Sequence, residues 1–140
     1  MVAGEIRVIG ILGVIRVFGK LRFFNFQFST FNFQLSIISM VKHIILWKLR
    51  DDLSGAEKES VKQGIKAGLE GLVGQVPGLL EVHVQIEGLL ESSNCDVMLD
   101  STLESPEALK GYAVHPAHVA VANGKVRPFT SVRTCIDYQF

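Results

Sequence analysis

Three side chains capable of acid–base chemistry stand out in the sequence: His43, Tyr112 and His118. An imidazole can accept a proton near neutral pH, and a phenol hydroxyl can donate a hydrogen bond to an oxygen atom. Taken alone, two of the three fit a packed core, because Tyr112 stands at helical spacing from Leu109 and His118 precedes apolar Val119. Their residue types permit chemistry, while their spacing alone favours packing.

His43 is the least ordinary of the three. In the segment VKHIILWKL it shares one strand face with Ile45 and Trp47, and a polar ring on such a face needs a hydrogen-bonding partner. This pattern predicts a ligand pocket beside His43, with Trp47 in the pocket wall or the core. His83 alternates with polar residues instead, so we expect it to face solvent.

Metal and cofactor patterns are weak. His115 and His118 lack a nearby carboxylate or cysteine to complete a zinc site, and His115, before Pro116, fits a helix N-cap or a surface position. Cys95 and Cys135 form no CxxC motif, and we expect both to be reduced and buried. The sequence has no P-loop, Rossmann or GxSxG motif, and we predict no metal and no cofactor.

Four strands are predicted from apolar alternation, over residues 41–49, 80–89, 95–102 and 131–140. The first carries apolar side chains on both faces, as a central strand does. With two helical segments between them, the order is β-α-β-β-α-β. This order predicts an α+β, ferredoxin-like fold with the helices on one face of an antiparallel sheet.

The two helical segments have clear start signals. A capping box at Ser54 opens the first, which we expect to end near Gly74. Ser105 caps the second, which is followed by proline at the first helical position. We expect that helix to be interrupted before Pro116 and to stop around Gly124.

The sheet face away from the helices needs a cover, because Ile44 and Leu46 point there if His43 points to the helices. A two-fold homodimer is the commonest way to bury such a face. The fold also separates the third strand from the fourth, so we expect Cys95 and Cys135 to be too far apart for a disulfide.

Residues 1–39 differ from the remainder in composition. They carry a net charge of +3 and seven of the nine phenylalanines, whereas residues 40–140 carry −3. A basic presequence, an added strand hairpin built on the alternating Phe24, Phe26 and Phe28, and sequence upstream of the native start are the alternatives. We favour the last, because residues from Met40 onward are complete as a domain; residues 1–39 are then an extension outside the fold.

Charge and hydropathy exclude several classes of protein. The chain has a formal net charge of zero and no basic patch interleaved with aromatic residues, so we predict no nucleic-acid partner. The apolar stretch VIGILGVI is too short to cross a bilayer, and we predict no membrane partner. Two cysteines without a disulfide pattern favour a cytoplasmic location.

Residues 40–140 resemble the stress-responsive dimeric α/β-barrel (Dabb) family. The resemblance rests on the MVKH start of the first strand and, above all, on the string YAVHPAH at Tyr112–His118. It implies a dimeric barrel of two ferredoxin-like domains. Residues 1–39 have no counterpart in the family pattern.

The resemblance also implies a site. A plant polyketide cyclase of this family uses the tyrosine and second histidine of the string as an acid/base pair, which implies catalytic roles for Tyr112 and His118, with His43 in the pocket. Such a pair can remove an α-proton from a carbonyl compound and stabilise the enolate. The sequence departs from that cyclase at the first helix, where Ile65 or Leu69 replaces a pocket tyrosine and the helix is about one turn longer.

Three functions follow as hypotheses. The first is a homodimeric binding protein for a small hydrophobic or carbonyl-containing ligand, whose pocket includes Ile45, Trp47, Ile65 and Leu69. The second is an enzyme, either a polyketide-cyclase-like lyase or a cofactor-free monooxygenase, and the third is a structural stress-response protein without catalysis. An open cavity of roughly 300 Å³ or more with Tyr112 and His118 both pointing into it would favour the first two, whereas a closed core around them would leave only the third.

Overall fold

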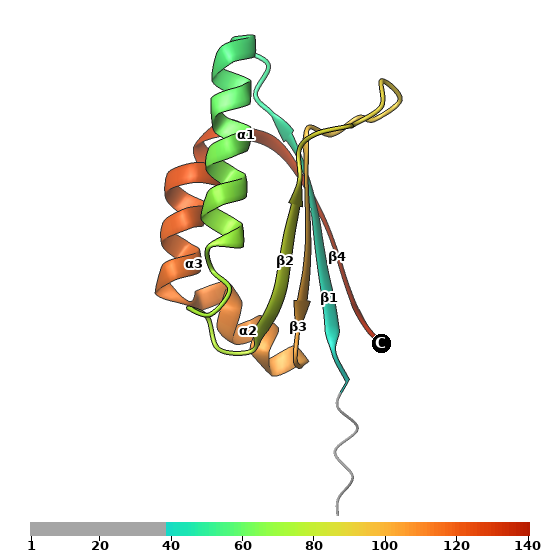
Figure 1. Cartoon of the computed structure of the whole chain (residues 1–140), viewed down its shortest axis with the longest axis vertical. Helices are drawn as coiled ribbons and strands as arrows, with labels where there is room; N and C mark the ends of the chain where they lie inside the picture. Colours follow the sequence, from blue (N-terminus) through green and yellow to red (C-terminus); the bar gives the residue numbers. More distant parts are fainter. Residues whose placement is uncertain (1–38) are drawn as a thin grey trace, which may run out of the picture. The chain divides into compact units, whose positions relative to one another are not determined.

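The computed structural model describes residues 39–140, which form four strands and a layer of helices (Figure 1). The alternating-phenylalanine segment, for which an added strand hairpin was one of the three alternatives, falls within residues 1–38, outside the described part. In residues 39–140 the element order is the expected β-α-β-β-α-β, with the second helical segment divided into shorter pieces.

The sheet is antiparallel with the strand order β2-β3-β1-β4. Its strands are β1 Val41–Leu49, β2 Leu79–Gln85, β3 Val97–Leu103 and β4 Thr130–Gln139. The central position predicted for the first strand is confirmed, since β1 pairs with both β3 and β4. β2 ends four residues before the expected Leu89, because β3 begins only at Val97 and leaves the intervening chain without a strand partner.

Helix α1 spans Gly55–Glu70 and begins with the predicted capping box. The Ser54 hydroxyl accepts a hydrogen bond from the Glu57 amide, and the Glu57 carboxylate accepts one from the Ser54 amide. The helix ends at Gly71, before the expected Gly74, which has a φ of +82° in the following turn. The apolar spacing predicted too long a helix, because Leu72 is buried like the helix residues although it lies in the following turn.

The second helical segment is broken at the predicted proline. Helix α2 spans Pro106–Val114, and α3 spans Pro116–Val121. His115 caps α3 through its Nδ1 atom, which accepts a hydrogen bond from the Ala117 amide at 3.2 Å. The expected stop at Gly124 is wrong: a π-helical turn, Ala122–Val126, and a 3₁₀ turn, Arg127–Phe129, carry the chain on to β4. Val126 is buried in the core, and this packing favours the continued turn.

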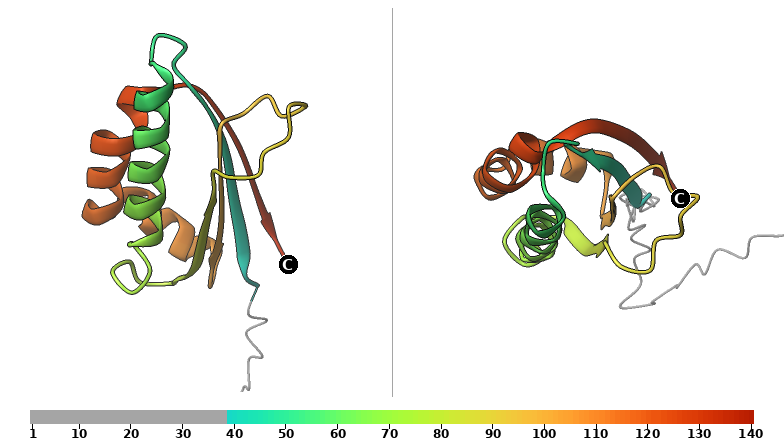
Figure 2. Two further views of the ribbon diagram at one scale, coloured as in Figure 1. Left: turned by 45° about the horizontal axis from the view of Figure 1, so that its top comes forward. Right: turned by 90° about the horizontal axis from the view of Figure 1, so that it is seen from above.

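The helices cover one face of the sheet, and no other element of residues 39–140 covers the opposite face (Figure 2). The core lies between the two layers, with β1 contributing Ile45, Trp47 and Leu49. On the open face, Val132, Ile136 and Tyr138 of β4 are 52%, 58% and 46% exposed. Ile44 and Leu46 of β1 are half-buried on the same face, as expected from alternation.

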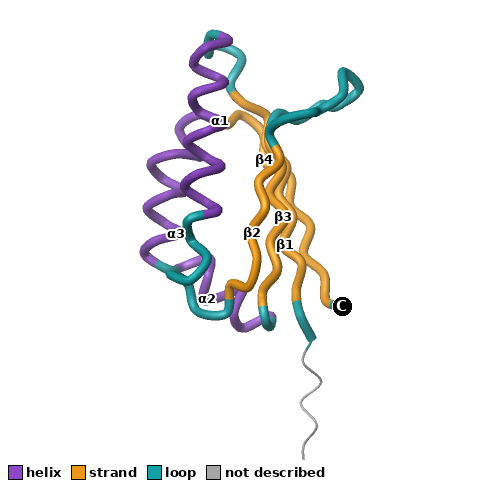
Figure 3. The backbone as a smooth tube through the Cα atoms, in the orientation of Figure 1, coloured by secondary structure: helices purple, strands orange, loops and turns teal. Residues whose placement is uncertain are grey.

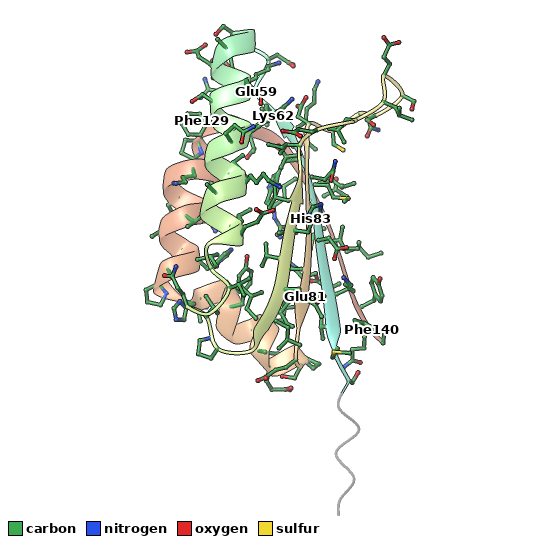
Figure 4. The ribbon with its side chains drawn as sticks, in the orientation of Figure 1. Glu59, Lys62, Glu81, His83, Phe129 and Phe140 are labelled. Carbon is green, nitrogen blue, oxygen red and sulfur yellow. The ribbon has the colours of Figure 1, made fainter. Side chains whose placement is uncertain are left out.

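Two further features flank the open face. The loop between β2 and β3, residues 86–96, projects away from the helices (Figure 3). Glu81 and His83 lie along β2, and Phe140 follows the end of β4 (Figure 4). His83 is exposed, as predicted, and its Nε2 atom lies 3.0 Å from the Gln85 Oε1 atom.

The two cysteines are both reduced, and their expected burial is wrong. Cys95 is half-buried and Cys135 is exposed, because β4 is an edge strand that only β1 borders. Strand β1 separates β3 from β4, as expected. Among residues 39–140, no helix combines the length and the apolar character needed to cross a bilayer.

Candidate functional site

A cavity of about 370 Å³ lies between the sheet and the helices. Its floor is apolar and includes Ile45 and Trp47 of β1, Leu69 of α1 and Leu99 of β3, all of them buried. Its polar lining includes His43, Tyr112 and His118, from β1, α2 and α3. The fold thus brings the three acid–base candidates of the sequence to one cavity.

Tyr112 is the most enclosed of these three side chains. Its side chain is 1% exposed, and its hydroxyl has no hydrogen-bond partner among residues 39–140. Burial raises the pKa of Tyr112 to about 12. The phenol is therefore protonated at neutral pH and able to donate a hydrogen bond.

His118 packs against Tyr112, with the ring centroids 4.1 Å apart and the ring planes tilted by 38°. Its Nδ1 atom lies 3.3 Å from the Ala113 carbonyl oxygen, which can only accept, so Nδ1 carries the hydrogen. Burial lowers the pKa of His118, and the Ala113 carbonyl opposes that shift. At neutral pH the imidazole is neutral with Nε2 unprotonated, which suits it to accept a proton.

His43 makes a contact that the sequence did not reveal. Its Nδ1 atom lies 2.6 Å from a carboxylate oxygen of Asp137, its cross-strand partner on β4. The carboxylate accepts, so Nδ1 holds the proton and a neutral His43 leaves Nε2 as an acceptor. The His43 ring meets the edge of Tyr112 at a centroid distance of 5.8 Å. Asp137, His43, Tyr112 and His118 therefore form one chain of contacts.

The predicted pocket residues divide between the cavity and the core. Ile45, Trp47 and Leu69 line the cavity. Ile65 is fully buried on α1 and belongs to the core, outside the cavity lining. Of the two α1 residues predicted for the pocket, Leu69 is therefore the one that faces the cavity.

Within residues 39–140, one group of side chains could hold a metal ion. The Nδ1 atom of His43, the Sγ atom of Cys135 and a carboxylate oxygen of Asp137 lie within 4.8 Å of one another. This mixed N, S and O set suits zinc, with one position left for water or a ligand. A bound ion would have to replace the hydrogen bond between His43 and Asp137. The sequence suggested only His115 and His118 as possible metal ligands. The set of His43, Cys135 and Asp137 could not be predicted, because the pairing of β1 with β4 brings its members together.

Arg127 and Arg133 also line the cavity and were absent from the predicted site. Arg127 lies in the 3₁₀ turn beyond the expected end of the second helix, and Arg133 lies on β4 opposite Trp47. The alternation of β4 contained a usable signal: with Val132 and Ile136 on the open face, Arg133 must face the helices.

Comparison with known proteins places this architecture in one family. The model of the stress responsive A/B barrel domain (Dabb) matches residues 41–140. Olivetolic acid cyclase from Cannabis sativa is 27% identical over 100 residues, covering 70% of this chain and 94% of that protein. The stress-response A/B barrel domain-containing protein HS1 from Arabidopsis thaliana is 35% identical over 86 residues, covering 59% of this chain and 73% of that protein.

Solved structures agree with the fold. A dimeric protein of unknown function with a ferredoxin-like fold, from Bacteroides fragilis, superposes with a TM-score of 0.67 and is 33% identical. The match covers 72% of this chain and 96% of that chain. With its ferredoxin-like sheet and a family match over residues 41–140, the chain belongs to the stress-responsive A/B barrel (Dabb) domain family.

Proposed function

We propose that this chain is a homodimeric binding protein for a small apolar carbonyl compound, held in the cavity beside Tyr112. The observation that carries the proposal is the Tyr112 hydroxyl, which is buried at the cavity without a partner among residues 39–140. Leaving a buried donor without an acceptor costs about 1–3 kcal/mol. A ligand carbonyl would supply the missing acceptor.

The cavity wall defines the class of ligand. Ile45, Trp47, Leu69, Leu99 and Leu109 offer an apolar surface that favours an aromatic or aliphatic body. A volume of about 370 Å³ falls within the range of small-molecule sites, about 300–1,000 Å³. A purely structural role leaves both the cavity and the partnerless hydroxyl unexplained.

The open sheet face supports the homodimer part of the proposal. Val132, Ile136 and Tyr138 expose apolar surface on a strand that also carries the cavity residue Arg133 on its opposite face. The relative from Bacteroides fragilis is described as dimeric. Pairing two copies through this face would bury that surface and hold β4 in place beside the cavity.

A second function, catalysis of proton transfer, is favoured by His118. The lowered pKa keeps its imidazole neutral near Tyr112, and one relative is a cyclase. In this reaction Nε2 of His118 takes an α-proton, the C–H electron pair forms the carbon–carbon double bond, and the carbonyl π pair moves to oxygen to give the enolate. The Tyr112 hydroxyl donates a hydrogen bond to the resulting enolate, and the proton then returns to carbon or oxygen.

Binding is tested with two probes that differ in the carbonyl group, butyrophenone and butylbenzene. Calorimetry gives their affinities, and fluorescence of Trp47, the sole tryptophan, reports occupancy of the cavity. We expect butyrophenone to bind more tightly than butylbenzene, and Tyr112→Phe to abolish that preference. Tyr138→Phe, which changes the other tyrosine, should retain it. Equal binding of both probes by the wild-type protein would contradict the proposal.

Catalysis is tested by exchange of the α-hydrogens of butyrophenone in deuterated water, followed by NMR. The wild-type protein should accelerate exchange above the buffer rate, and His118→Gln should remove the acceleration while retaining ligand binding. Binding of the ketone without accelerated exchange would leave the binding function and reject catalysis.

A further inference from the structure

We infer that the ligand of this cavity is a carboxylate as well as a carbonyl compound, with its anionic end held at the rim by Arg127 and Arg133. The inference deepens the proposed function and rests on it. It concerns a part of the cavity that neither the apolar floor nor the Tyr112 hydroxyl explains.

The charged lining of the cavity has one sign. The ionisable side chains in the lining are His43, Tyr112, His118, Arg127 and Arg133, and no carboxylate of residues 39–140 is among them. Arginine is permanently cationic, an imidazole carries no negative charge, and the raised pKa of Tyr112 keeps its phenol neutral. An anionic ligand therefore meets two guanidinium charges at the rim of this cavity. The neighbouring carboxylate of Asp137 lies outside the lining and is held by the Nδ1 atom of His43 at 2.6 Å.

The lining also changes with depth. Ile45, Leu69, Leu99 and Tyr112 are buried, whereas Arg127 and Arg133 are exposed in the lining of the same cavity. The cavity therefore extends from an apolar floor to a cationic rim. A ligand that fits this gradient has an apolar body, a central carbonyl and a terminal anion.

The two guanidinium groups are available for such an anion. Within residues 39–140 neither makes an ion pair, and Arg127 is held by the neutral side-chain amide oxygen of Asn123. They come from separate elements, the 3₁₀ turn and β4, and the fold places both in the lining of one cavity. Planar guanidinium groups bind carboxylates through paired N–H donors.

The field of both arginines reaches the site. Burial is the main cause of the lowered pKa of His118, and the positive charges of Arg127 and Arg133 are among the smaller causes that lower it. A carboxylate between the two arginines would neutralise part of this field. The rim and the proton-accepting imidazole are therefore electrostatically linked.

The test compares three ω-benzoyl alkanoates, 3-benzoylpropionate and its two next longer homologues, with the corresponding neutral amides. Chain length is varied so that the spacing between Tyr112 and the rim need not be assumed. We expect at least one acid to bind more tightly than its amide, by about tenfold when both arginines engage it. Arg127→Gln and Arg133→Gln should each reduce this preference about threefold, and the double variant should remove it.

Lys110→Gln is the matched control, because it removes one exposed positive charge that does not line the cavity. This variant should retain the acid preference. Loss of the preference in Lys110→Gln as well would indicate long-range attraction and would overturn the assignment to the rim arginines.

The remaining outcomes separate the two proposals. If butyrophenone binds but no acid is preferred over its amide, the carboxylate inference is wrong and the carbonyl pocket stands. If neither the acids nor butyrophenone bind, both are wrong. Since both arginines are exposed, their glutamine variants should fold normally, which thermal unfolding without ligand verifies.

Discussion

Replacing Tyr112 by phenylalanine should stabilise the ligand-free protein and weaken ligand binding at the same time. The hydroxyl is buried at the cavity and has no partner among residues 39–140, so it contributes a desolvation penalty in the folded state. Such a penalty is about 1–3 kcal/mol. The lower end applies here, because the cavity reaches exposed side chains at Arg127 and Arg133 and can admit water.

The expected gain in the free energy of unfolding is therefore about 1 kcal/mol, equivalent to a rise of about 4 °C in Tm for a domain of this size. The lost hydrogen bond to a ligand carbonyl is worth about 1 kcal/mol, so Kd for butyrophenone should rise about fivefold.

Urea unfolding at one fixed protein concentration measures the first effect, because dimerisation makes stability depend on concentration. Calorimetry measures the second. A loss of 1 kcal/mol or more in the variant would show that the hydroxyl is satisfied within the folded protein. An unchanged Kd would show that the ligand carbonyl does not meet it. Either result would refute the reasoning from the partnerless hydroxyl.

Three further predictions concern the dimer, the site histidines and pH. Ile136→Glu places a charge on the open sheet face and should yield a monomer in light scattering. Val114→Glu, at an exposed position on α2, should leave the mass unchanged. A dimeric Ile136→Glu variant would show that the interface lies elsewhere. The Asp137 carboxylate fixes His43 in the tautomer that carries its hydrogen on Nδ1, so Asp137→Ala should allow both tautomers. The ¹⁵N NMR spectrum of His43 should then change from one tautomer to a mixture. An unaltered spectrum would show that the carboxylate does not select the tautomer. Because burial lowers the pKa of His118 below 6.5, the unfolded chain binds a proton more readily, and stability should fall as pH drops from 6.5 toward the folded pKa. His118→Gln should flatten this part of the stability profile, and an unchanged slope would assign it to other groups.

Much of the fold could be predicted because its signals are local. The capping box at Ser54, the helix break at Pro116 and the two-faced apolar pattern of β1 each depend on a few neighbouring residues. Local signals failed at helix ends. Buried Leu72 continues the apolar spacing of the first helix beyond its end, whereas Gly124 suggested a stop that burial of Val126 overrides.

The site was less predictable because its contacts join distant parts of the chain. His43 and Asp137 become partners only through the register of β1 against β4, which no single segment encodes. Cys135 was expected to be buried, but edge position depends on the strand order of the whole sheet. Arg127 was missed because the chain continues in a π-helical turn past Gly124. His43, Tyr112 and His118 share a cavity, and their roles there stay predictions.

The central claim, that the Tyr112 hydroxyl donates to a ligand carbonyl, is tested most directly by infrared spectroscopy of butyrophenone labelled with ¹³C at the carbonyl. In an apolar cavity a hydrogen bond lowers the carbonyl stretching frequency, so the bound band in the wild-type protein should lie below the band in Tyr112→Phe. The shift should persist in Tyr138→Phe. Identical bound bands in the wild-type protein and in Tyr112→Phe would contradict the account.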